Sequence, residues 1–191
     1  MIREKETVHS ILFFGHKRPL VSQSDISDLL WVGSPIDCLN VGTQHEFKLI
    51  IISFHHLSLA EWADIVELCK ALKSNAHTKS IPVLALLPYP HRRLMGQLDG
   101  VTDFVRIVLP ELLQCDDELS RMIRYLNDED VTKCRRFKIC PHLNYIAISE
   151  RHEMTVCGGY KNRMVIGRRR LEDFCHTHEH ENCPYFLNLK L

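Results

Sequence analysis

The segment Lys48–Ser53 constrains the fold more than any other stretch of this chain. It reads Lys-Leu-Ile-Ile-Ile-Ser, with four consecutive apolar residues, three of them β-branched, and no polar face. A strand of this kind has to be covered on both faces, as the central strands of parallel sheets are. The segment therefore predicts an α/β domain in which helices pack on both sides of a parallel sheet.

The chain around this strand alternates short apolar runs with segments of helical period, as βα units do. Besides 48–53, strands are expected at 9–15, 37–41, 81–87 and 101–107. Helices are expected at 24–31, 58–73, 91–98 and 110–127. Five such units in about 120 residues predict a flavodoxin-like, doubly wound (βα)5 fold.

These segments resemble the receiver domains of two-component response regulators over residues 9–127. The likeness rests on Phe47–Ser53, Leu68–Lys73, Ser80–Leu84 and Asp99–Val105. It implies the receiver fold and order of elements. A receiver also needs acidic residues after its first strand to hold Mg²⁺, an Asp at the end of the third strand to accept phosphate, a Ser or Thr ending the fourth, and a Lys after the fifth.

This chain lacks those functional residues. The corresponding positions hold Gly15 and His16, Ser53, Leu87-Pro88, and Arg106–Val108. There is neither a carboxylate set for Mg²⁺ nor a nucleophile, since Ser53 has no base beside it in the sequence. The resemblance thus implies a pseudo-receiver that acts through its surface and independently of phosphorylation. Asp103 and Arg106 are interpreted as solvated loop residues, and the pair His55-His56 as a polar loop after the third strand.

A domain boundary is expected near residue 128. The acidic stretch Asn127–Asp130 is interpreted as solvated, and the charge balance changes across it, from 13 Lys and Arg against 16 Asp and Glu in residues 1–128 to 11 against 8 in residues 129–191. This shift is too small to indicate nucleic acid as the main partner. The expected domains are a receiver-like domain, 1–128, and a small, irregular cysteine-rich module, 129–191. Helical periodicity is absent from this module, except for one short helix expected at Leu171–Phe174.

The cellular compartment bears on how the cysteines are used. The charged start Met1–Glu6 has no leader pattern, and the longest apolar run is far below the ~20 residues that span a membrane. A cytoplasmic protein without membrane contact is expected, and disulfides are rare in that reducing compartment. Residues 129–191 hold five of the eight cysteines but few large apolar side chains, so a metal centre is expected to organise them. The predicted ligands are Cys140, Cys157, Cys175 and Cys183.

The spacing of these four cysteines bears on the metal. They are separated by 16, 17 and 7 residues, whereas structural zinc sites usually bring cysteines in pairs two to four residues apart. Cys140 and Cys183 precede proline, as the last cluster ligand of bacterial ferredoxins does. The pattern favours an iron–sulfur cluster such as [4Fe–4S], with Zn²⁺ as the alternative. The segment also resembles the four-cysteine tails of small bacterial signalling proteins that end like Cys183–Phe186, a likeness that implies no activity.

Several companion residues are not assigned to the metal. Cys134 is left as a spare ligand or an exposed cysteine, and His176, His178 and His180 as groups around the ligands or in solvent. Whether any of these four residues takes part in ligation stays open. The run Arg168–Arg170 is interpreted as a solvated face, because three basic residues fall short of a nucleic-acid patch. Cys38, Cys69 and Cys115 are assigned to packing or to the surface.

The function expected from these features is non-enzymatic. A pseudo-receiver would be coupled to a four-cysteine metal centre that acts as a sensor or as a structural brace. The expected partner is a protein of a signalling pathway, with a homodimer through the receiver-like domain as another arrangement. Two alternatives stay open: a structural zinc module that contacts protein or nucleic acid, and a thiol or electron-transfer redox protein in which Cys134, beside Arg135 and Arg136, is the reactive thiol.

Overall fold

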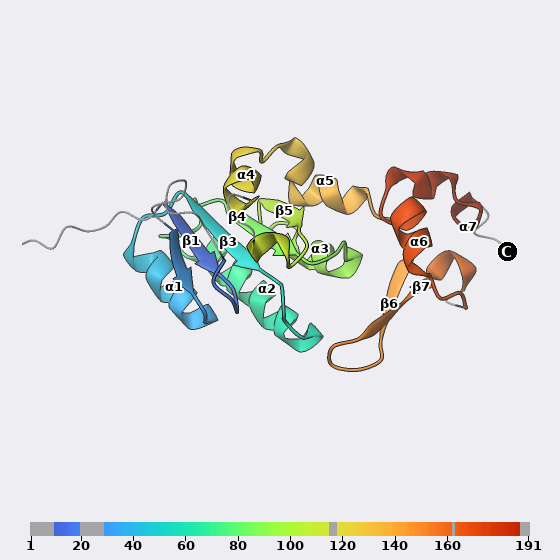
Figure 1. Cartoon of the computed structure of the whole chain (residues 1–191), viewed down its shortest axis with the longest axis horizontal. Helices are drawn as coiled ribbons and strands as arrows, with labels where there is room; N and C mark the ends of the chain where they lie inside the picture. Colours follow the sequence, from blue (N-terminus) through green and yellow to red (C-terminus); the bar gives the residue numbers. More distant parts are fainter. Residues whose placement is uncertain (1–9, 20–28, 115–117, 162, 188–191) are drawn as a thin grey trace, which may run out of the picture.

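A computed structural model describes residues 10–19, 29–114, 118–161 and 163–187. Its centre is a five-stranded parallel sheet with the order β2-β1-β3-β4-β5, which is the order of flavodoxin-like folds (Figure 1). The strands are β1 (Ile11–Phe14), β2 (Leu29–Val32), β3 (Leu49–Ser53), β4 (Val83–Leu87) and β5 (Phe104–Ile107). The predicted α/β fold with a parallel sheet is confirmed.

Both faces of β3 are buried, as its sequence requires. Ile50 and Ile52 belong to a core that is completed by α1 (Pro35–Gln44), α2 (Leu59–Ser74) and α3 (Arg92–Leu98). Ile51 belongs to a second core on the other face, which includes residues of α4 (Glu118–Arg124). Alternate side chains of one strand thus anchor two layers of helices.

Two elements between β1 and β3 differ from the sequence interpretation. Residues 29–31, expected at the end of a helix, belong to β2, which pairs in parallel with β1, while residues 24–28 lie outside the described residues. Residues 37–41, expected as a strand, lie in α1. The Ser34 side chain accepts a hydrogen bond from the Asp37 backbone N–H, and Pro35 occupies the first turn. These start signals favour a helix more strongly than the short apolar run favours a strand.

The other expected elements of the sheet domain are found within a few residues of their predicted bounds, except the last helix. In place of a continuous helix over 110–127 there is a 3₁₀ turn, η1 (Leu112–Gln114), and the short helix α4; residues 115–117 lie outside the described residues. Beyond it, helical structure occurs where none is expected. A 3₁₀ turn, η2 (Asp128–Asp130), leads into α5 (Thr132–Phe137), which runs toward the C-terminal segment (Figure 1).

The C-terminal segment begins with an antiparallel hairpin. Its strands are β6 (Leu143–Ala147) and β7 (Glu153–Cys157). Short helical turns follow: η3 (Gly158–Tyr160), α6 (Arg168–Arg170), the π-helical turn η4 (Leu171–Cys175), η5 (His178–Asn182) and α7 (Pro184–Leu187). Within the described ranges, no helix is long and apolar enough to cross a membrane.

This segment packs against the same side of the sheet domain as α1, α2 and α3. Leu143, Ile166 and Cys175 belong to the same hydrophobic cluster as the sheet residues on that face. The Tyr145 hydroxyl accepts a hydrogen bond from the Arg92 backbone N–H at 2.9 Å. The cysteine-bearing segment and the sheet therefore share one continuous core.

Candidate metal centre

The four predicted ligands lie around one small cavity of the C-terminal segment. Cys140 follows α5, Cys157 ends β7, Cys175 ends the π turn and Cys183 directly precedes α7. The cavity has a volume of about 20 Å³. Its remaining wall is mainly apolar and includes Leu143, Met164, Ile166 and Phe186. Four cysteines that are distant in sequence are thus brought together in a largely water-excluding environment.

Backbone hydrogen bonds hold the cysteine-bearing loops to one another. The Cys140 N–H donates to the Cys175 carbonyl at 2.7 Å, and the Cys157 N–H donates to the Met164 carbonyl at 2.9 Å. The Cys183 N–H donates to the carbonyl of His180 at 3.0 Å. Each loop is therefore fixed by its backbone, which leaves the thiol side chain free to point into the cavity.

The two Cys-Pro dipeptides share a local arrangement. Burial acts to raise the pKa of both Cys140 and Cys183, and backbone N–H groups that follow each proline act against it through hydrogen bonds: that of His142 on Cys140, and those of Tyr185 and Phe186 on Cys183. Such hydrogen bonds stabilise a thiolate and, in iron–sulfur proteins, help to set the reduction potential. The turn after each Cys-Pro dipeptide thus offsets part of the effect of burial on its sulfur, enough to lower the pKa of Cys183 but not that of Cys140.

The thiols cannot all ionise without compensation. Burial raises the pKa of Cys140, and it raises the pKa of Cys175 to about 12, with the neighbouring thiols adding to the effect. Burial also acts to raise the pKa of Cys183, but the hydrogen bonds from Arg170 and from two backbone N–H groups outweigh it, so the net pKa is lowered. Metal ligation requires thiolates, so a bound cation would displace protons from this group.

Four cysteines around one cavity are suitable in type and number to ligate a metal, but their side chains would have to move to hold an ion. Among the described residues, no group of three or more His, Cys, Asp or Glu is positioned to hold a metal ion. Tetrahedral Zn²⁺ bonded at about 2.3 Å needs sulfurs about 3.8 Å apart. A cavity of about 20 Å³ is little more than a single water molecule requires. Binding would therefore rotate the thiols inward around one ion, or move the loops apart around a cluster.

The companion residues separate into different environments. His180 is buried, lines the cavity and has Nδ1 2.6 Å from the Thr177 carbonyl, so Nδ1 carries the proton. His176 lines a separate groove of about 700 Å³ between the C-terminal segment and the sheet domain, and burial lowers its pKa. His178 is exposed, as is Cys134, which does not line the cavity. Of the three histidines, only His180 lies beside the four cysteines.

The remaining cysteines of the sheet domain behave as packing residues. Cys38 and Cys69 are fully buried, and burial raises the pKa of each thiol to about 12. Of the two roles expected for them, packing or the surface, both thiols have the first. Cys115 lies outside the described residues.

Arg170 is a cavity residue that the sequence interpretation missed. Its Nη2 lies 3.6 Å from Cys183 Sγ, and its side chain lines the cavity. The run Arg168–Arg170 is solvated, as predicted, only at its first two positions. A sequence signal was present: Arg168 and Arg169 have a carboxylate four residues later, whereas Arg170 has Phe174 there.

At the end of the sheet where a receiver would be phosphorylated, hydrogen bonds close the structure. His55 Nε2 lies 2.7 Å from the Val108 carbonyl, and Nδ1 lies 3.0 Å from Ser53 Oγ. Because a carbonyl only accepts, Nε2 carries the proton and Nδ1 accepts from the Ser53 hydroxyl. Burial lowers the pKa of His55 and keeps the ring neutral.

His55 does lie in the turn after β3, as expected, but it is buried, and the expectation that Ser53 has no base beside it is wrong. Both residues are almost completely buried. A Cβ atom at Gly15 would meet Ser53 Cβ at 3.2 Å, so the neighbouring position is filled as well. The pair braces the ends of β3 and β5.

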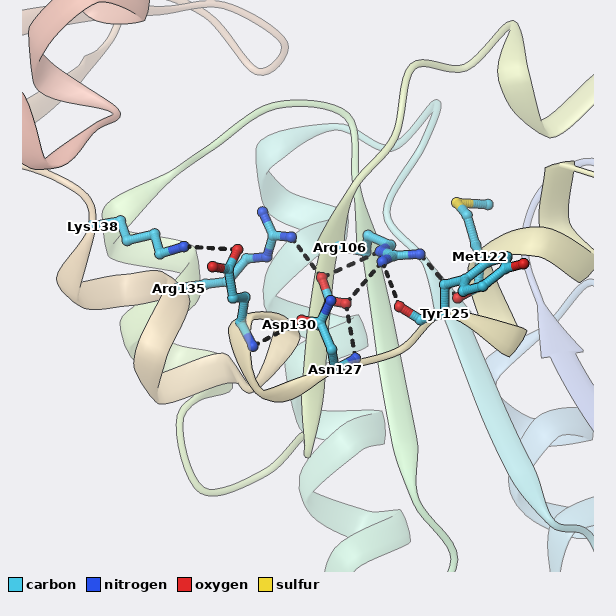
Figure 2. A network of polar contacts seen from close by, with 8 residues as sticks. Arg106, Met122, Tyr125, Asn127, Asp130, Arg135 and Lys138 are labelled. Carbon is cyan, nitrogen blue, oxygen red and sulfur yellow. Dashed lines mark hydrogen bonds and ion pairs between the residues drawn. The ribbon is translucent and has the colours of Figure 1, made fainter.

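The acidic stretch before α5 is not solvated at its last residue. Asp130 is fully buried, and its carboxylate accepts hydrogen bonds from Arg106 and Arg135 (Figure 2). Arg106 also donates to the carbonyls of Met122 at 2.9 Å and Tyr125 at 3.0 Å. The expectation of a solvated Arg106 is thus wrong, because Arg106 ties β5, α4 and the start of α5 together.

Asp103, also expected to be solvated, is held in place by two contacts. Its carboxylate accepts from the Val83 N–H at 2.7 Å and lies 2.6 Å from Lys73 Nζ. The carboxylate therefore links the starts of β4 and β5 to α2.

Comparisons with protein-family models, curated proteins and solved structures find no match. Functional inference for this chain therefore rests on the geometry of its sites.

Proposed function

We propose that this chain is a non-enzymatic signalling or regulatory protein, in which a four-cysteine metal centre is coupled to a receiver-like domain that works without phosphorylation. An iron–sulfur cluster is the favoured occupant. The observation that supports the proposal is the convergence of Cys140, Cys157, Cys175 and Cys183, from four separate elements, on one apolar cavity.

The closed end of the sheet supports phosphorylation-independent action. The positions that would bind Mg²⁺ and accept phosphate are occupied by Gly15 and by the buried Ser53–His55 pair. Neutral hydrogen bonds at this place stabilise one arrangement of β3 and β5. The domain would then contribute a stable surface for a signalling protein or for a second copy of the chain.

Direct contacts provide a route between the metal centre and the sheet domain. The helix α5 begins beside the Asp130 ion pairs and ends just before Cys140. Arg92 Nη1, from α3, donates to the Ile139 carbonyl at 2.8 Å, immediately before that cysteine. Movement of Cys140 on metal binding or loss would therefore act on both α3 and α5.

The chain's own residues would perform three tasks for a bound cluster. The cysteines would hold it, the N–H groups after each Cys-Pro dipeptide would stabilise the thiolate charge, and the apolar wall of Leu143, Ile166 and Phe186 would limit access of water. A cluster would supply a redox couple sensitive to its surroundings.

Metal analysis of anaerobically purified protein tests the proposal. Iron and acid-labile sulfide in equal stoichiometry, with visible absorption near about 400 nm that bleaches in air, are expected for a cluster. Folded protein obtained in full yield without iron, sulfide or zinc would refute the metal centre.

Structural zinc is the second candidate, and one observation favours it. The cavity of about 20 Å³ is closer to the size of a single ion than to that of a cluster. This alternative predicts stoichiometric zinc, no colour, and loss of structure in the C-terminal segment when a chelator is added.

The third sequence-based alternative, a thiol catalyst at Cys134, has weaker support. Cys134 is exposed, but the arginines beside it are engaged elsewhere, Arg135 with Asp130 and Arg136 with Asp99. Both guanidinium groups are thus paired with carboxylates, which weakens their ability to stabilise a thiolate at Cys134.

A further inference from the structure

Three consecutive arginines in α6 adopt different roles. Arg168 and Arg169 form ion pairs with Glu172 and Asp173, four residues later, and their side chains are 90% and 95% exposed. Arg170 takes part in none of the ion pairs found among the described residues. Because Arg170 has no carboxylate partner among the described residues, its guanidinium is available to another anionic group.

The position of the Arg170 guanidinium is fixed by two aromatic rings. Its Cζ lies 5.0 Å from the centroid of Tyr185 and 5.7 Å from that of Phe174. Guanidinium groups stack on aromatic rings in this manner, which reduces their rotational freedom. In this position Nη2 donates to Cys183 Sγ at 3.6 Å. The side chain is therefore aimed at the thiols by packing.

The charge balance of the cavity gives this contact its significance. Four thiolates around one divalent ion carry a net charge of −2. Among the described residues that line the cavity, Arg170 is the only one with a permanent positive charge, and none is a carboxylate. A charge-assisted hydrogen bond to an anionic acceptor in a low-dielectric site is stronger than the same bond in water.

We propose that Arg170 is the charge-compensating hydrogen-bond donor of the metal centre, a positioning residue that retains the metal through the sulfur of Cys183. This inference rests on the proposed four-cysteine centre and adds the residue that regulates its stability. Hydrogen-bonding partners of metal ligands typically contribute about 10- to 100-fold to metal affinity. Removal of the guanidinium should accelerate metal loss by a comparable factor.

The test uses the metal-loaded full chain as isolated under anaerobic conditions. Arg170→Met keeps an unbranched side chain that still packs between the rings but removes the donor and the charge. Arg170→Lys keeps the charge, and Arg169→Met is the matched control on the adjacent, solvated position. Metal content is measured first, followed by the rate of metal release to excess chelator and by thermal unfolding of each protein after metal removal.

We expect Arg170→Met to release metal about 10- to 100-fold faster than the unmodified chain, Arg170→Lys to recover part of that loss, and Arg169→Met to match the unmodified chain. The metal-free proteins should unfold at similar temperatures, because we expect Arg170 to act through the bound metal. If Arg170 only packed against its neighbours, Arg170→Met would destabilise the metal-free protein as well. If the metal is a cluster, Arg170→Met should also lower its reduction potential, since reduction adds negative charge that the guanidinium stabilises.

The outcomes separate this inference from the proposed function. A metal-free unmodified chain would refute the centre itself. A metal-loaded chain in which Arg170→Met releases metal at the unmodified rate would refute the role of Arg170 and leave the centre in place. If Arg170→Met lowers the unfolding temperature of the metal-free protein as much as that of the metal-loaded protein, the role of Arg170 at the metal is also refuted, and its role is packing.

Discussion

Replacement of Asp130 by asparagine should destabilise the whole fold. Its carboxylate is fully buried and contacts Arg106 and Arg135, whose side chains are 19% and 27% exposed. Removing one partner of a buried ion pair costs about 3–5 kcal/mol when the remaining charge is left in the interior. Because water reaches both arginines, we expect the low end, about 3 kcal/mol.

Urea denaturation monitored by circular dichroism measures this cost, and Asp128→Asn is the matched control. Asp128 belongs to the same 3₁₀ turn but is exposed, so its replacement should change the free energy of unfolding by no more than about 0.5 kcal/mol. Equal effects of the two substitutions would refute the reasoning that the buried network, and not the turn, supplies the stability.

The pH dependence provides a second check on Asp130. Burial acts to raise the pKa of Asp130, but the hydrogen bonds and charges of Arg135 and Arg106 outweigh it, so the pKa is lowered in the folded state. A carboxylate with a lowered folded pKa stabilises the protein above its unfolded pKa of about 3.9, and the contribution disappears as the pH falls through the folded value. The difference between the unmodified chain and Asp130→Asn should therefore be constant near neutral pH and shrink below about pH 4.

Three further sets of substitutions have outcomes that the geometry predicts. Cys140→Ser or Cys183→Ser should abolish most of the metal content measured after anaerobic purification, while Cys134→Ser keeps it, because Cys134 does not line the cavity. Ser53→Ala should cost about 1–3 kcal/mol in urea denaturation, since it leaves His55 Nδ1 buried without its donor. Ser120→Ala should be neutral or stabilising, because the Ser120 hydroxyl is buried and has no hydrogen-bond partner among the described residues. Equal losses would contradict the role of the Ser53–His55 pair as a brace. Gly15→Ala should cost about 1–3 kcal/mol, since the new Cβ would lie 2.9 Å from Phe13 Cε1. Gly96→Ala in α3, where the added Cβ would have no atom of the described residues within 4 Å, should instead stabilise by about 0.4–1 kcal/mol. A stabilising Gly15→Ala would show that the end of β1 has more room than these contacts allow.

The sheet was predictable because its signal is local. The run Leu49–Ile52 cannot form a solvated strand or an amphipathic helix, so its burial, and with it the parallel sheet, follows from a single short segment. The helix at 58–73 was equally clear, since its apolar residues lie on one face and Ser58 provides a capping box with Glu61. The α1 helix was missed although Ser34 and Pro35 are a readable start signal, because the apolar residues between them and β3 are too few to show a period.

The interactions of single polar side chains were not predictable, because their partners are distant in the chain. His55 contacts Val108, and Asp130 contacts Arg106, across 53 and 24 positions. No local pattern distinguishes these residues from solvated loop residues. For the four cysteines, residue type alone suggested proximity, but it did not reveal that Arg170 and His180 share their cavity.

The shared core has a consequence for how the protein is made. The hydrophobic cluster that begins at Leu12 in β1 also contains Cys175, about 160 residues later in the chain. At a synthesis rate of about 5–20 residues per second, the core on the side of α1, α2 and α3 remains incomplete for roughly 8–30 s after β1 is made. The nascent sheet therefore has to avoid aggregation during this interval, and the metal proposed above could bind only after it.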